Sequence, residues 1–152
     1  MSIESQVELL FAVRLVVAAV LGAVIGYERE RRGRSAGIRT FAAVALGSCA
    51  FTLISFIVTP EGNETTRIAA QIVTGVGFLG AGVILHDQGQ THISGLTTSA
   101  TMWSAGAIGM AVGFGLYIVA VVTTVLLLLL LLLRHIPGLE RHPVHDSDNA
   151  NQ

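Results

Sequence analysis

The sequence is poor in charge. Only 12% of its 152 residues are charged, against roughly 25% in a typical soluble domain, and the mean hydropathy is +0.69. This composition excludes an ordinary water-soluble domain and points to a bilayer. Lysine is absent, and nine arginines against ten acidic residues leave a formal net charge of −1. That balance gives no reason to expect nucleic-acid binding.

Cysteine is nearly absent as well. Cys49 is the only one, which excludes intramolecular disulfides and zinc sites built from thiolates. We interpret it as an inert core thiol. No serine or cysteine stands with a histidine and an acid at a helix boundary, where nucleophilic chemistry is assembled. We therefore expect no enzyme.

Apolar stretches of membrane-spanning length are what the sequence has instead. A transmembrane helix takes about 20 mainly apolar residues, and five stretches approach that length, which predicts an all-α, polytopic membrane protein. The predicted spans are 9–27, 40–58, 68–85, 96–112 and 116–133. We take residues 1–135 as one transmembrane domain and residues 136–152 as a polar, disordered tail.

The arginines predict the orientation. Short arginine-rich segments stay in the cytoplasm, and five of the nine arginines fall within Glu28–Arg39. This segment is therefore placed inside, so that the N-terminus lies outside and the C-terminus is cytoplasmic. Arg134 and Arg141 follow the last span on the inner side, whereas Arg67 marks an outer boundary.

Arg14 is the one charge inside a predicted span. It shares a helix face with Ala18, Gly22 and Gly26, a ridge of small residues that favours close helix packing. Two interpretations follow: Arg14 faces protein, with Gln71 as a candidate partner, or it snorkels to the outer surface.

The third span is rich in glycine. Four glycines there each cost roughly 0.8 to 1 kcal/mol of helix propensity in water. Either a neighbouring helix packs against the bare backbone, or the helix is broken and offers its carbonyls to an ion. The glycines are Gly75, Gly77, Gly80 and Gly82.

Hydroxyl side chains gather in two spans. The second span carries a stripe that includes Ser48, Thr52 and Ser55, and the fourth begins with Thr97 and Thr98. These hydroxyls either bond to carbonyls of their own or a neighbouring helix, or they line a polar path in the second span and a shallow cytoplasmic cavity in the fourth.

The predicted inner face holds three carboxylates. Glu28, Glu30 and Asp87 are candidate ligands for weak magnesium binding, because Mg²⁺ is held by one or two carboxylates while it keeps several waters. The alternative is that the two glutamates form i, i+4 pairs with Arg32 and Arg34. Arg39 completes this charged segment, where arginines also meet anionic lipid.

Three strings resemble the MgtC/SapB family of bacterial inner-membrane proteins. They are GYERE at 26–30 with AGIRT at 36–40, RIAAQIVTGVGFLGAG at 67–82, and GLTTSATMW at 95–103. The resemblance implies a helical domain of the inner membrane linked to magnesium limitation and acid stress. Longer members append a cytoplasmic domain, and only a short polar tail follows here, so we expect a short form.

Two functions follow as hypotheses. The first is a magnesium-related transporter or homeostasis factor, to which the family strings and the inner carboxylates point. The second is a non-transporting regulatory subunit that binds through small-residue helix faces. We expect the lipid bilayer as its surroundings, and a second copy or another inner-membrane protein as its partner.

Overall fold

The computed structural model describes residues 3–58, 65–85 and 94–133, which form five helices. The all-α prediction is confirmed. Four helices match the predicted spans to within three residues, and the first extends its span at both ends. The helices are α1 (Ile3–Arg31), α2 (Ile38–Val58), α3 (Thr65–Leu85), α4 (Leu96–Gly113) and α5 (Tyr117–Leu133). Asp87 and the predicted tail at 136–152 lie outside the described residues.

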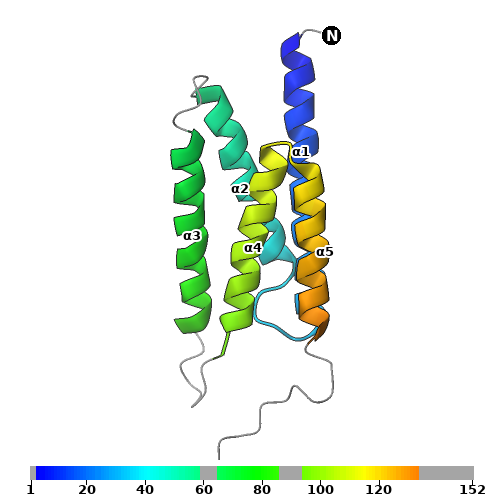
Figure 1. Ribbon diagram of the computed structural model, residues 1–152, viewed down its shortest axis with the longest axis vertical. Helices are drawn as coiled ribbons and strands as arrows, with labels where there is room; N and C mark the ends of the chain where they lie inside the picture. The colour runs from blue at the N-terminus through cyan, green and yellow to red at the C-terminus, as the bar shows by residue number, and fades with distance from the viewer. Residues whose placement is uncertain (1–2, 59–64, 86–93, 134–152) are drawn as a thin grey trace, which may run out of the picture.

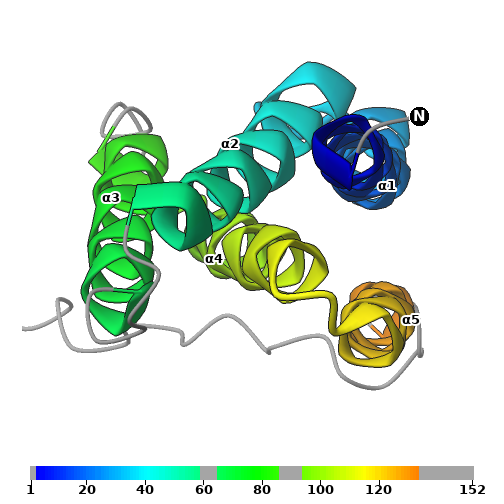
Figure 2. The same ribbon diagram turned by 90° about the horizontal axis from the view of Figure 1, so that it is seen from above.

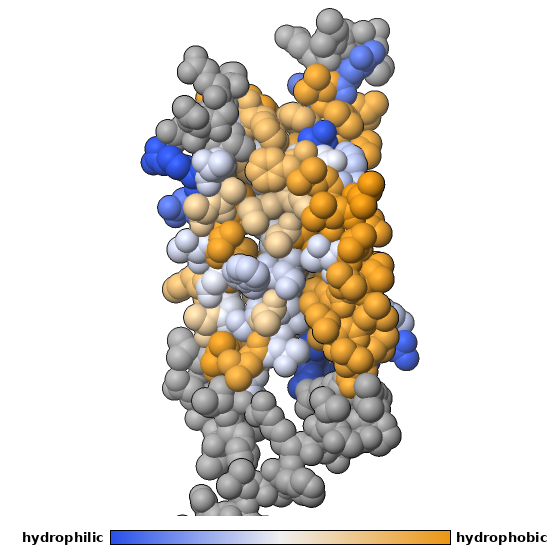
Figure 3. Space-filling view, in the orientation of Figure 1, coloured by the Kyte–Doolittle hydropathy of each residue, from blue (hydrophilic) through white to orange (hydrophobic). Residues whose placement is uncertain are grey.

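The helices have the length and composition of a membrane protein. α1, α2 and α3 are each long and apolar enough to cross a bilayer, and α5 is a shorter apolar helix. The outward face of α5 is strongly apolar, with Ile118 81% exposed and Leu130 63% exposed (Figure 3). Such residues suit contact with lipid. The orientation, with the N-terminus outside, stays a prediction.

The helix α4 lies at the centre of the bundle and contacts each of the other four. Seen from above, α2 and α4 lie between α3 on one side and the pair α1 and α5 on the other (Figure 2). The helices run roughly side by side, and the N-terminal part of α1 extends beyond its neighbours (Figure 1). The largest fully buried side chains, Phe41, Ile25 and Ile108, come from α2, α1 and α4.

Glycines bring α4 and α1 close to α2. A Cβ atom at Gly109 would overlap the backbone carbonyl of Ala45, and one at Gly113 would lie 2.7 Å from Cβ of Thr52. On α1, a Cβ atom at Gly26 would lie 2.6 Å from Cα of Ile38, and Gly22 is packed as closely. Any side chain at these positions would push the helices apart.

The packing predicted for the third span is only partly right. Gly80 lies against Ser99 of α4, but a Cβ atom at Gly75, Gly77 or Gly82 would meet nothing within 4 Å. The reason is the face that α3 presents to the bundle, which carries Ile72 and Val76 instead. α3 is also continuous from Thr65 to Leu85, not broken.

The charged segment that follows the first span is not all loop. α1 continues to Arg31, with Arg29 and Arg31 in its last turn, where positive charge is favourable at a helix C-terminus. Only residues 32–37 connect α1 to α2, and Gly33 makes the turn with a φ of 64°.

Gly109→Ala should destabilise the protein, because the added methyl group meets the Ala45 backbone and no rotamer avoids it. Overpacking of this kind costs about 1 to 3 kcal/mol. Gly77→Ala is the matched control: its methyl group enters open space and should be neutral or slightly stabilising. Thermal unfolding in detergent compares the two, and equal midpoints would contradict the close α2–α4 contact.

Candidate functional site

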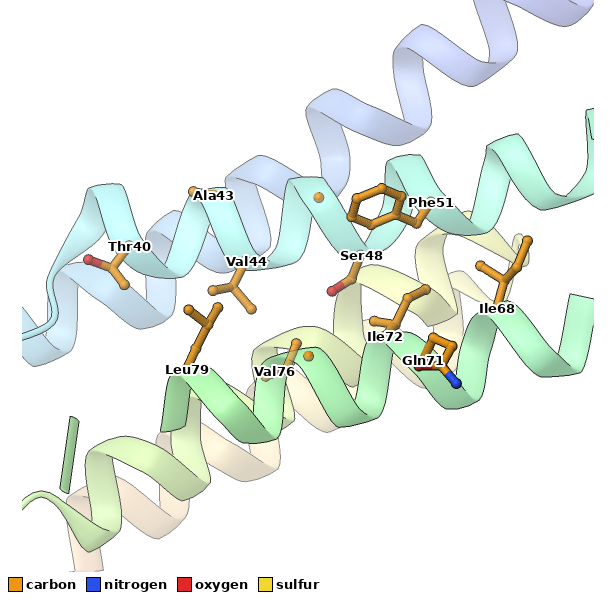
Figure 4. Close-up of a pocket in the computed structure, with 12 residues that line it drawn as sticks. Thr40, Ala43, Val44, Ser48, Phe51, Ile68, Gln71, Ile72, Val76 and Leu79 are labelled. Carbon is orange, nitrogen blue, oxygen red and sulfur yellow. The ribbon is translucent and has the colours of Figure 1, made fainter. Parts of the chain in front are cut away.

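The candidate site is a groove between α2 and α3 with a volume of about 640 Å³. Both helices pack against α4, and the groove lies between their facing sides (Figure 4). Its lining is mostly apolar, with three polar side chains among the twelve residues. They are Thr40, Ala43, Val44, Gly47, Ser48, Phe51, Ile68, Gln71, Ile72, Gly75, Val76 and Leu79.

Ser48 is the buried polar group of this groove. The residue is 3% exposed, and its hydroxyl points from α2 into the space between the helices (Figure 4). The next two hydroxyls of the stripe behave differently: Thr52 donates to the Ser48 carbonyl at 2.8 Å, and Ser55 donates to the Thr52 carbonyl at 2.6 Å. Among the described residues, no hydrogen bond is formed by the Ser48 hydroxyl.

Gln71 faces the same groove from α3. Its side chain is exposed and lines the opening, and at 1.5 Å per residue it lies about 9 Å along the helix from Thr65. On the two walls, Gly47 and Gly75 have nothing within 4 Å of an added Cβ. The groove therefore combines open backbone with polar groups that have no partner in the described part of the chain.

Arg14 meets protein, as one of the two interpretations holds, but its partners are on α4 and α5. Its Nη1 donates to the Gly113 carbonyl at 2.8 Å, and its Nε donates to the Tyr117 hydroxyl at 3.2 Å. Gln71 as partner is wrong, because α1 and α3 make no contact within the described residues. Arg14 thus fastens α1 to the turn that joins α4 to α5.

Arg29 fastens α1 to the other end of α4. It is 4% exposed, and its Nη2 donates to Oγ1 of Thr98 at 2.8 Å. The Glu28 carboxylate lies 3.9 Å from Nη1 of Arg29 and also pairs with Arg32, four residues on. Thr97, which the sequence analysis names together with Thr98, is exposed.

Glu30 has a different role from the surface pair with Arg34. Its Oε2 accepts a hydrogen bond from the backbone N–H of Ile38 at 3.0 Å, and so caps the start of α2. Glu28 and Glu30 are therefore both engaged by cations or amides. Arg39 is exposed on the first turn of α2, and within the described residues no three acidic, histidine or cysteine side chains gather around a metal position.

The sequence pattern of the MgtC family matches residues 15–138. The chain belongs to the MgtC family.

Among curated relatives, "Putative magnesium transporter YhiD" of Escherichia coli strain K12 is 42% identical over 119 residues, which cover 73% of this chain and 54% of that protein. "Protein MgtC" of Salmonella typhimurium strain LT2 is 46% identical over 107 residues, covering 70% of this chain and 45% of the relative. The chain spans about half the length of these relatives. No solved structure matches.

Two features of this MgtC-family site escape analysis of the sequence. The partners of Arg14 and Arg29 lie 99 and 69 residues away along the chain, so no local spacing reveals them. Ser48 belongs to a stripe in which Thr52 and Ser55 donate to carbonyls of their own helix, and only the position of α3 sets Ser48 apart. The glycines of α4 were a readable signal, because Gly106, Gly109 and Gly113 keep spacings of three and four.

Arg14→Met should destabilise the α1–α4 contact, because it leaves the Gly113 carbonyl without its charged donor. Hydrogen bonds to charged groups contribute about 1.5 to 3 kcal/mol. Tyr117→Phe should lower the unfolding free energy by less. The double variant should lose less than the sum of the two single losses, because both side chains belong to the same hydrogen-bonded cluster. Thermal unfolding of the four proteins measures this, and full additivity would contradict the shared contact.

Thr98→Val should lower stability because Arg29 loses its buried acceptor. The adjacent Thr97→Val is isosteric and removes an exposed hydroxyl, so it should change the unfolding free energy by no more than about 0.5 kcal/mol. We expect a loss of about 1.5 to 3 kcal/mol for Thr98→Val. Equal effects in thermal unfolding would show that the Arg29–Thr98 contact does not hold the helices together.

Proposed function

We propose that this chain is a magnesium-related homeostasis factor of the bacterial inner membrane that binds another membrane protein and does not move the ion itself. The relation to magnesium is supported by family membership and by the name of the Escherichia coli relative. The observation that carries the binding role is the α2–α3 groove, where Ser48 and Gln71 have no partner among the described residues and the walls are open backbone.

Polar groups in this groove call for a polar occupant. A side-chain amide or hydroxyl facing hydrocarbon loses hydrogen bonds that an acyl chain cannot replace. Ser48 lies halfway along α2, and Gln71 lies within α3. A transmembrane helix with a polar side chain at their depth would supply the missing bonds.

Open backbone favours a helix as that occupant. Small residues allow the close approach on which helix association in lipid depends. Gly47 faces the groove from α2 and Gly75 from α3, so a third helix would meet bare backbone on both sides. The four helices that contact α4 leave this position unfilled within the described residues.

Ion transport has less support from the described residues. The carboxylates of Glu28 and Glu30 are engaged by Arg32 and by the start of α2. Buried hydroxyls such as Thr101 and Thr124 donate to carbonyls of their own helices, and α3 has no break that would offer carbonyls to an ion. Transport is the second candidate because of the Escherichia coli relative's name.

Photocrosslinking in native membranes tests the binding role. A photoreactive residue at Gly75 should trap one defined membrane protein, while the same residue at Ile118, 81% exposed on α5, should trap lipid only. Transmembrane hydrogen bonds contribute about 0.6 kcal/mol on average and at most about 1.7. Gln71→Leu with Ser48→Ala should therefore lower the yield by at least roughly threefold.

Three outcomes would contradict this role. They are adducts of equal yield from Gly75 and Ile118, an adduct made only of two copies of this chain, and a yield unchanged by Gln71→Leu with Ser48→Ala. Sequencing of the adduct must also identify a partner helix that carries a polar side chain at the depth of Gln71.

Magnesium flux into liposomes separates the two candidates. Proteoliposomes loaded with a magnesium-sensitive dye should show no flux above empty liposomes, for the natural chain and for Glu28→Gln alike. Flux that falls in Glu28→Gln and in Asp87→Asn would favour transport over partner binding.

A further inference from the structure

A second pocket, of about 610 Å³, lies at the end of the bundle where α4 begins and α3 ends. The 32–37 connection passes the same end (Figure 1). Thr40 and Leu79 line both this pocket and the groove, so the two adjoin. We call it the Arg34 pocket, after the one charged residue among the described residues that line it. Its other polar side chains are Ser35, Thr40 and Ser94.

Ser94 gives this pocket an unused donor. Its hydroxyl oxygen is buried and has no hydrogen-bond partner in the described structure, although it lines the pocket. A buried hydroxyl without a partner is rare in folded proteins, and it points to a ligand that accepts a hydrogen bond there.

The start of α4 adds backbone donors beside Ser94. The first amides of a helix have no intrahelical acceptor, and together they form its positive end. Gly95 precedes α4 with a φ of 83° and provides no side-chain cap. At the start of α2, in contrast, the first N–H donates to the Glu30 carboxylate. The two helix starts at this end therefore differ, because only α2 has a side-chain cap among the described residues.

The charge of this end also favours an anion. Residues 28–39 hold five arginines and two glutamates, and Glu28 is already shared by Arg29 and Arg32. The Arg34 side chain lies within ion-pair distance of no carboxylate among the described residues, and none of the described residues that line the pocket is acidic. The described lining thus offers an anion a cationic donor, and it offers a cation such as Mg²⁺ no carboxylate.

We propose that the Arg34 pocket binds a phosphate group. The guanidinium of Arg34, the Ser94 hydroxyl and the first amides of α4 are its donors, and phosphate oxygens accept several such bonds at once. The group belongs either to the headgroup of an anionic phospholipid or to a free phosphate. This inference is independent of the partner bound in the α2–α3 groove.

Two binding measurements distinguish the sources. The full chain is placed in nanodiscs of phosphatidylcholine. Native mass spectrometry then measures the binding of added phosphatidylglycerol, and titration calorimetry measures the binding of inorganic phosphate. Saturable binding of phosphatidylglycerol without binding of inorganic phosphate identifies a lipid headgroup site, whereas binding of inorganic phosphate identifies a site for free phosphate.

Three variants distinguish a built site from surface charge. Arg34→Gln should weaken binding about tenfold, because it removes a charged donor. Ser94→Ala changes no charge and should still weaken binding several-fold. Arg31→Gln is the matched control: it removes the same charge from an exposed residue, which stacks on Tyr27 at 5.8 Å, and it should leave site-specific binding within about twofold.

The proposal is overturned by two results. One is the absence of saturable binding of either probe to the natural chain. The other is an equal loss in Arg34→Gln and Arg31→Gln together with no loss in Ser94→Ala, which would indicate attraction to the surface alone. Thermal unfolding of each variant checks the fold, and Ser94→Ala carries the test alone if Arg34→Gln fails to fold.

Discussion

The close approach of α4 to α2 places every other helix, because α4 is the element that all of them contact. In lipid no hydrophobic force drives helices together, so the approach depends on backbone contact and dispersion. Gly109 and Gly113 supply it by leaving the Ala45 carbonyl and Thr52 side chain against bare α4 backbone. A bulkier α4 would displace α1, α3 and α5 together.

Two arginines of α1 bind the two ends of that central helix. The dipole of α4 favours the positive charge at one end and opposes it at the other. Arg14 binds the carbonyl of Gly113 at the C-terminus of α4, where positive charge is favourable. Arg29 lies beside Thr98 at the N-terminus of α4, where the dipole opposes it. Glu28 lies next to Arg29 and offsets part of that repulsion. The N-terminal end of α4 thus keeps an excess of positive character, and this is also the end where the Arg34 pocket lies.

How much of this could be predicted depends on how far each feature reaches along the chain. The five helices follow from apolar length, and the close-packed Gly22 and Gly26 follow from a local ridge of small residues. For Glu30, local spacing suggests a pair with Arg34, whereas its role as the acceptor for the Ile38 N–H depends on where the chain turns before α2. The Arg14 partners come from helices far along the chain, so spacing alone could not identify them.

The four glycines of α3 were predicted to pack against a neighbouring helix, and the positions that do not are informative. Each interior glycine lowers helix propensity, so a glycine with no neighbour among the described residues has no compensation from packing against them. Gly80 has one, since it lies against Ser99, while Gly75 opens onto the α2–α3 groove and Gly82 onto the Arg34 pocket. Two of the uncompensated positions therefore coincide with the two cavities. Beside them, the groove holds Ser48 and Gln71 and the pocket holds the Ser94 hydroxyl, none of which has a hydrogen-bond partner in the described part of the chain. Bare backbone beside unused polar groups is the arrangement expected where contacts are completed by another molecule.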